Sequence, residues 1–225
     1  MTHRKAVAFL ALFGALAAGP ALAQHDLPGD GTVRAAKLVY ANNKSSVCFS
    51  ERFLTEVAEQ THIATHDKLV PVKSDSAELF DHPFAVMTGE GAFTLTDAQV
   101  DNLRTYLEFG GFVIASAGCS SKDWNRSMGR SIDRLFPDAE LTTLDADHPI
   151  FHSVYDITSS RYKSGGARLP ELRALERDGR VVLIWSPDGL NDTANAGGNC
   201  CCCGGNEIKS AKQLNVNILA YALTH

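Results

Sequence analysis

Six cysteines carry the most distinctive chemistry in this sequence. Four of them are consecutive, Cys200–Cys203, and a glycine pair stands on each side of the run. The other two are Cys48 and Cys119. Thiolates exchange disulfides, oxidise and bind soft metals, so four thiols in a row require an explanation beyond ordinary packing. The run predicts a disulfide element, a metal or cluster site, or a thiol redox centre.

The predicted metal site has all six cysteines as ligands. Within the run, two cysteines have the C-x-x-C spacing that lets two thiolates face one ion, although the chain has no second pair of this kind. Thiolates select Cu(I), Zn²⁺ or iron–sulfur clusters, which are the cofactors to expect. Disulfides without a metal are the competing interpretation, and the sequence does not choose among the pairings. The predicted metal ligands are Cys200, Cys201, Cys202, Cys203, Cys119 and Cys48.

Cys119 offers a separate possibility, because small residues surround it between a predicted strand and a predicted helix. This is the pattern of a nucleophile elbow, in which backbone N–H groups can bind an oxyanion. A cysteine nucleophile needs a base, and His148 is the first candidate. The alternative interpretation is a cysteine that is simply buried after a strand. Other candidate bases are His152 and His82, and the candidate acids are Glu90, Asp147 and Asp156.

The elements that must position these residues follow from the hydrophobic pattern. Short apolar runs alternate with helical periodicity, which predicts an α/β fold. Each cysteine falls after a predicted strand and before a predicted helix. If the strands are parallel, all six thiols lie at the carboxyl edge of the sheet, where such folds bind ligands. The predicted strands are 37–41, 69–72, 84–87, 112–115 and 180–185, and the predicted helices follow Ser50, follow Thr96, and cover about 123–136 and 207–223.

The start of the chain reads as a secretory signal over residues 1–23, with a basic start, an apolar stretch and a small-x-small cleavage site. We expect residues 24–36 to be a flexible lead-in and residues 37–225 to form a single domain in a periplasmic or secreted protein. The net charge of −5 and the lack of a basic cluster argue against a nucleic-acid partner. No later apolar segment is long enough to span a membrane after signal cleavage. The sequence does not indicate which small ligand or protein partner binds.

Six segments of the chain, 81–91, 110–114, 135–137, 147–152, 155–157 and 206–208, form a recognisable order. Together they resemble the DUF4159 family over roughly residues 37–223. The family is similar to the class I glutamine-amidotransferase-like superfamily, near its ThuA-like, trehalose-utilisation-type branch. The resemblance implies a three-layer flavodoxin-like fold, with a mostly parallel sheet and helices on both faces, and no settled activity.

Within this resemblance, Cys119 matches the elbow cysteine region of the amidotransferases. The late strand ends in residues 186–190, which contain no histidine where those enzymes place one. The superfamily also does not explain the run Cys200–Cys203. Three functions therefore remain open at this point: a metal-binding or thiol redox module, a cysteine-dependent hydrolase that uses Cys119, and a non-catalytic binding domain stabilised by disulfides.

Overall fold

The structure is a computed structural model, and it describes residues 31–42, 48–197, 200 and 207–225. Its centre is a seven-stranded sheet with the strand order β2-β1-β3-β4-β9-β8-β5. The neighbouring strands β2, β1, β3, β4 and β9 are parallel, whereas β8 pairs antiparallel with both β9 and β5. A separate small hairpin consists of β6 and β7.

The strands are β1 (Ala36–Val39), β2 (Val70–Lys73), β3 (Phe84–Gly89), β4 (Phe112–Ala117), β5 (Leu141–Thr143), β6 (Ser160–Arg161), β7 (Ala167–Arg168), β8 (Arg173–Arg177) and β9 (Arg180–Ser186). The α-helices are α1 (Arg52–Gln60), α2 (Asp97–Glu108), α3 (Lys122–Leu135) and α4 (Ala211–Thr224). The described residues also contain the short 3₁₀-helices η1 (Ala77–Asp81), η2 (Gly118–Ser120), η3 (Pro149–Phe151) and η4 (Thr193–Asn195). None of the helices in the described part of the chain is both long and apolar enough to cross a bilayer.

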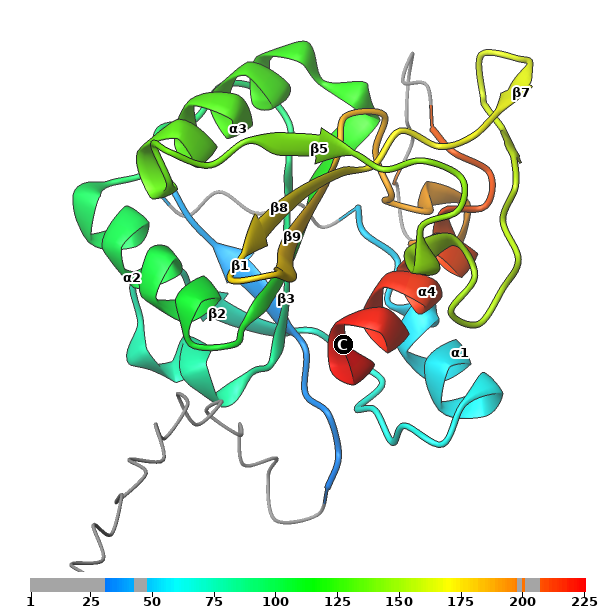
Figure 1. Cartoon of the computed structure of the whole chain (residues 1–225), viewed down its shortest axis with the longest axis horizontal. Helices are drawn as coiled ribbons and strands as arrows, with labels where there is room; N and C mark the ends of the chain where they lie inside the picture. The colour runs from blue at the N-terminus through cyan, green and yellow to red at the C-terminus, as the bar shows by residue number, and fades with distance from the viewer. Residues whose placement is uncertain (1–30, 43–47, 198–199, 201–206) are drawn as a thin grey trace, which may run out of the picture.

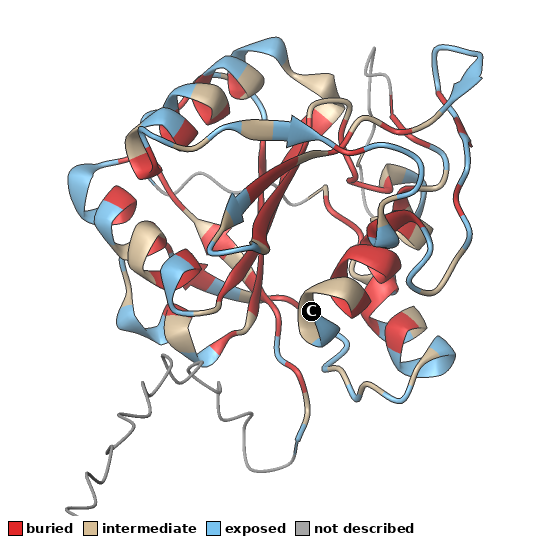
Figure 2. Ribbon diagram, viewed as in Figure 1, coloured by how far each residue is buried: buried red, intermediate tan, exposed pale blue. Residues whose placement is uncertain are grey.

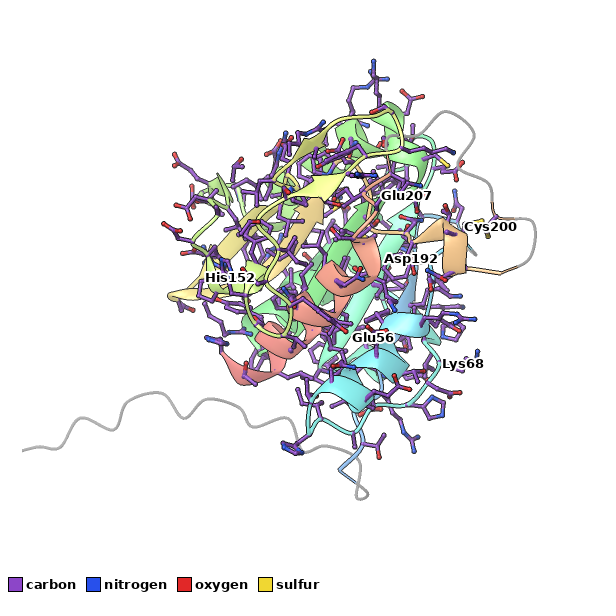
Figure 3. The ribbon with its side chains drawn as sticks, turned by 90° about the vertical axis from the view of Figure 1, so that its right-hand side faces the viewer. Glu56, Lys68, His152, Asp192, Cys200 and Glu207 are labelled. Carbon is purple, nitrogen blue, oxygen red and sulfur yellow. A yellow bond between two sulfur atoms is a disulfide. The ribbon has the colours of Figure 1, made fainter. Side chains whose placement is uncertain are left out.

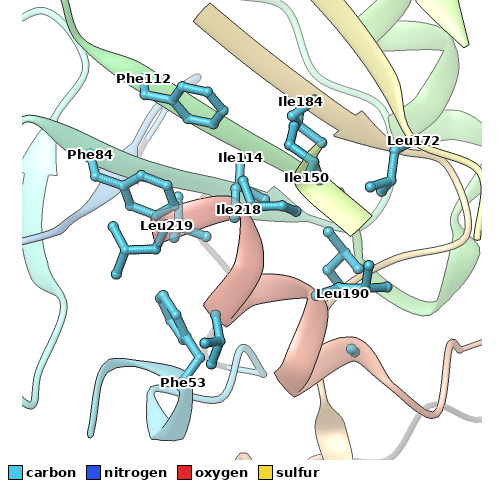
Figure 4. Packing of buried hydrophobic residues seen from close by; sticks show 14 of the residues in the cluster. Phe53, Phe84, Phe112, Ile114, Ile150, Leu172, Ile184, Leu190, Ile218 and Leu219 are labelled. Carbon is cyan, nitrogen blue, oxygen red and sulfur yellow. The ribbon is translucent and has the colours of Figure 1, made fainter. Parts of the chain in front are cut away.

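Alternate side chains of the central strands point to opposite faces of the sheet and form two cores. In β3, Phe84 packs with α1 and α4 in one core, and its neighbour Ala85 packs with α2 and α3 in the other. The strands are buried on both faces because helices cover both (Figures 1 and 2). Phe84 and Phe112 stack in the first core with ring centres 5.7 Å apart, close to Phe53 of α1 (Figure 4).

The predicted α/β class with a mostly parallel sheet is confirmed, and each predicted strand and helix has a counterpart. Thr96 caps α2 as expected, in a capping box with Gln99. The last helix begins at Ala211, later than the predicted start at 207. The reason is tertiary pairing, because Ile208 forms a bridge with Tyr162 before the helix begins.

Candidate functional site

The carboxyl ends of the parallel strands form one edge of the sheet, which we call the carboxyl edge. β1, β3, β4 and β9 run in the same direction, so the segments that follow them leave from this edge. Cys48 follows β1, Glu90 follows β3, Cys119 follows β4, and Cys200 lies between β9 and α4. The strand order thus places the three described cysteines in segments that leave the same edge.

Cys48 and Cys200 form a disulfide between residues 152 positions apart. The bond joins the segment after β1 to the segment before α4, and Figure 3 shows Cys200 on the same side of the molecule as Asp192 and Glu207. Glu207 accepts hydrogen bonds from the backbone and the hydroxyl of Thr193, the latter at 2.6 Å. The disulfide therefore fastens a segment that buried polar contacts also hold in place.

The disulfide removes two of the six predicted metal ligands. A sulfur in a disulfide is not a thiolate, so Cys48 and Cys200 are not metal ligands while they are joined. Cys201, Cys202 and Cys203 lie outside the described residues. Among the described residues there is no group of three or more His, Cys, Asp or Glu side chains placed to hold a metal. Metal binding by the remaining cysteines stays a prediction.

Cys119 lies in the sharp turn between β4 and α3. Its backbone has φ 52° and ψ 31°, and the next residue, Ser120, also has a φ of 52°. A left-handed conformation is uncommon for residues other than glycine and is found more often at functional sites. Cys119 is partly exposed and is not joined to Cys48 or Cys200. The turn has the strand–cysteine–helix form that the sequence predicts for an elbow.

Glu90 is the group that meets the Cys119 thiol. The distance from Cys119 Sγ to Glu90 Oε1 is 3.5 Å, within the range of a hydrogen bond donated by S–H to a carboxylate. Gly118 makes this approach possible, because a Cβ at that position would lie 2.9 Å from Glu90 Cγ. The N–H of Gly91 donates to Ser121 Oγ at 3.1 Å and holds the Glu90 segment against the start of α3. The structure therefore brings together a thiol and a carboxylate that are 29 residues apart.

A buried tyrosine–tryptophan pair supports the end of β3. Tyr40 donates a hydrogen bond to the carbonyl of Thr88 at 3.0 Å and accepts one from Trp124 Nε1 at 2.7 Å. Burial raises the pKa of Tyr40 to about 12, against the opposing effect of the Trp124 hydrogen bond. A Cβ on Gly89 would lie 2.3 Å from the Tyr40 hydroxyl, so only glycine fits there. These contacts fix the backbone that carries Glu90.

Asn191, which sequence reasoning missed, ties three segments together at the carboxyl edge. Its amide donates to the carbonyl of Cys48 at 2.7 Å and to Thr88 Oγ1 at 3.1 Å, and its carbonyl accepts from Ser116 Oγ at 2.6 Å. The side chain is buried, so each of these bonds replaces water that the amide has lost. The sequence offered one signal for this role of Asn191, which is that it forms a polar pair with Asp192 after a buried strand.

Asp188 and Arg168 were also missed, and they hold the other side of the Cys119 turn. The carbonyl of Asp188 accepts a hydrogen bond from Ser120 Oγ at 2.8 Å, and its carboxylate pairs with Arg168 at 2.9 Å. Arg168 in turn lies over the ring of Tyr162, 3.8 Å from its centre. The β6–β7 hairpin is thereby anchored beside the turn that carries Cys119.

His148, the predicted base, lies away from the Cys119 turn. Its Nδ1 accepts a hydrogen bond from the N–H of Ile150 at 3.2 Å, and its ring packs against Tyr221 with centres 5.5 Å apart. Burial is the main reason that the pKa of His148 lies below its ordinary value. Tyr221 is near the C-terminal end of α4, which runs from the carboxyl edge back toward the opposite edge. These contacts do not bring His148 to Cys119.

His152 belongs to the same region as His148. Its two ring nitrogens lie 2.7 Å from the carbonyl of Ala146 and 2.6 Å from Asp156 Oδ1. These two acceptors, the carbonyl first, raise the pKa of His152. Figure 3 shows His152 and Cys200 on opposite sides of the molecule.

The remaining described histidines also lie near the amino ends of the strands. His82 precedes β3 and contacts the carbonyl of Arg34 at 2.9 Å, and His66 precedes β2. His62 and His225 line a cavity at the end of α4. Within the described part of the chain, no histidine contacts the Cys119 turn, so a Cys–His pair stays a prediction without a supporting contact.

Comparison with known proteins adds the family. Residues 34–223 match the family described as "Domain of unknown function (DUF4159)". The chain belongs to the DUF4159 family. The match covers the whole described sheet and the helices α1 to α4 of this DUF4159 domain, except for the last residue of α4. No curated protein matches the chain.

Proposed function

We propose that this DUF4159 protein is an exported thiol redox protein in which Cys119 is the residue that reacts with oxidants. The observation that carries the proposal is the Cys119 turn, which holds a partly exposed thiol in a left-handed backbone conformation 3.5 Å from the Glu90 carboxylate. Exposure makes a cysteine more open to oxidation, and a neighbouring carboxylate can take up the thiol proton as the sulfur reacts.

Oxidation fits this site better than acyl transfer. A cysteine hydrolase uses a base, usually histidine, within hydrogen-bond reach of its nucleophile. The described histidines contact other parts of the molecule, and the acid at Cys119 is Glu90. Oxidation of a thiol needs an oxidant and a way to move one proton, and Glu90 is placed to accept and return that proton.

The oxidant in this proposal is a hydroperoxide. The Cys119 sulfur attacks one peroxide oxygen, a new S–O bond forms, and the O–O bond breaks with its electron pair on the leaving oxygen. The S–H proton passes through Glu90 to that oxygen, so the products are a sulfenic acid at Cys119 and water or an alcohol. Sulfur is oxidised, the peroxide is reduced, and no further reagent is required.

Trapping of the sulfenic acid tests the proposal. The protein is treated with hydrogen peroxide in the presence of dimedone and mapped by peptide mass spectrometry, with Cys119→Ser as the matched variant. We expect the adduct on the Cys119 peptide of the wild type and no adduct on the same peptide of the variant. An adduct confined to Cys201–Cys203, or no adduct at all, would refute the role of Cys119.

Two broader proposals accompany this function, one on the fold type and one on export. The parallel strand order β2-β1-β3-β4-β9 and the two cores support a flavodoxin-like three-layer arrangement of the class I glutamine-amidotransferase-like type. The signal-like residues 1–23 support export to the periplasm or the cell exterior. The Cys48–Cys200 disulfide is compatible with an oxidising compartment.

A further inference from the structure

The strand order reverses between β1 and β3, and this creates a crevice at the carboxyl edge. β1 continues through α1 to β2, whereas β3 continues through α2 to β4. α1 packs in one core and α2 in the other, so the two connections leave on opposite faces of the sheet (Figure 1). Open α/β sheets bind their ligands in the crevice at such a reversal.

A cavity of about 330 Å³ lies at this position. Ala41 and Asn42 line it from the segment after β1, residues 92–94 line it from the segment after β3, and Arg130 lines it from α3. The lining contains a guanidinium, an amide and a hydroxyl, and no acid among the described residues. In a chain with a net charge of −5, this set of donors favours an anion.

Arg130 differs from the arginines one turn before and after it on α3. Arg126 forms an ion pair with Asp123, and Arg134 pairs with Asp97 at 2.7 Å. Arg130 donates one hydrogen bond, to Ser127 Oγ at 2.9 Å, and forms no ion pair with any described carboxylate. A guanidinium has five N–H donors, so most of those on Arg130 remain for a ligand. Its planar fork matches a phosphate or carboxylate group.

The opposite wall of the cavity is held firmly against α3. The N–H of Phe93 donates to Ser127 Oγ at 3.0 Å, and Arg134 Nη1 donates to the carbonyl of Leu95 at 2.6 Å. Ser127 therefore contacts both the loop and Arg130. A wall that is fixed before a ligand arrives lowers the entropy lost on binding.

A second cavity, of about 510 Å³, continues from the first and shares Phe93, Thr94 and Arg130 with it. Its acid, Asp97, is already paired with Arg134. Arg130 thus stands where the two cavities meet. One cavity has room for an oxyanion group and the other for the organic part of the same ligand.

We infer that Arg130, Asn42 and Thr94 form a binding site for a small ligand that carries a phosphate or carboxylate group. The site begins two residues after Glu90, but it does not depend on oxidation of Cys119. It would remain if the proposed redox role of Cys119 failed.

Titration of ¹⁵N-labelled protein with inorganic phosphate, and separately with acetate, at constant ionic strength tests the inference. We expect saturable NMR shifts of the Asn42, Ala92, Phe93 and Thr94 amides, with the tighter of the two anions indicating whether the ligand offers a phosphate or a carboxylate. Arg130→Gln should weaken binding about tenfold, because a charge-assisted hydrogen bond is lost. Arg126→Gln is the matched control, since it removes the same charge one turn away, and it should bind like the wild type. Absence of saturable shifts with both anions, or equal weakening in the two variants, would overturn the inference.

Discussion

Replacement of Glu90 by glutamine removes a carboxylate oxygen that lies 3.5 Å from Cys119 Sγ. Two unit charges at this separation repel each other by about 1 kcal/mol in a water-like dielectric, the value suited to an exposed carboxylate and a partly exposed thiol. This repulsion disfavours the Cys119 thiolate. Removal of the Glu90 charge should therefore increase the thiolate fraction of Cys119 roughly fivefold to tenfold. Iodoacetamide reacts with thiolate, and the rate of Cys119 alkylation at neutral pH should rise by the same factor.

The assay is the time course of iodoacetamide labelling of the Cys119 peptide, followed by mass spectrometry. Glu78→Gln is the matched control, because Glu78 is an exposed acid of η1, which precedes β3, and its replacement changes the net charge equally. The rate of peroxide oxidation divided by the rate of alkylation should fall in Glu90→Gln, since the group that carries the proton is gone. An alkylation rate that is unchanged or lower in Glu90→Gln would refute the reasoning about this pair.

Three further predictions concern stability and pH. Reduction of the Cys48–Cys200 disulfide should lower the free energy of unfolding by about 2–5 kcal/mol, near the upper end because the loop is long; an unchanged urea midpoint with reductant would contradict this. Gly89→Ala should cost roughly 1–3 kcal/mol in urea unfolding, because the new Cβ meets the Tyr40 hydroxyl, and a variant as stable as the wild type would contradict the close packing. NMR titration should show the pKa of His152 above the ordinary value of about 6.5. The stabilisation that protonated His152 gives should be complete below about pH 6.5 and should be lost as the pH rises through the raised pKa. An ordinary or lowered pKa of His152 would contradict this prediction.

Local signals in the sequence were sufficient for the elements that carry the site. The apolar run that became β4 and the Thr96 cap of α2 are read from neighbouring residues alone. The strands β5 and β8 were missed, because β5 is short and partly exposed and β8 contains two arginines. Those arginines lie over aromatic rings, Arg173 over Trp185 and Arg177 over Phe136, so a polar sequence is accommodated in the sheet.

The partners within the site could not be predicted in the same way. The pairing of Cys48 with Cys200 depends on the spatial order of β1 and β9, which no local pattern encodes. Glu90 was one of several candidate acids near Cys119, and only the neighbouring position of β3 and β4 selects it. His148 was a reasonable base by residue type, yet the path of α4 holds it beside Tyr221.

The central claim is that Cys119 is the reactive thiol of this protein. The most direct measurement is treatment of the native protein with less than one equivalent of hydrogen peroxide, without reductant and with excess dimedone as the label for sulfenic acid, followed by peptide mapping of every cysteine. We expect the Cys119 peptide to carry most of the label. Label found mainly on Cys201–Cys203, with Cys119 unmodified, would contradict it and would move the chemistry to the cysteine run.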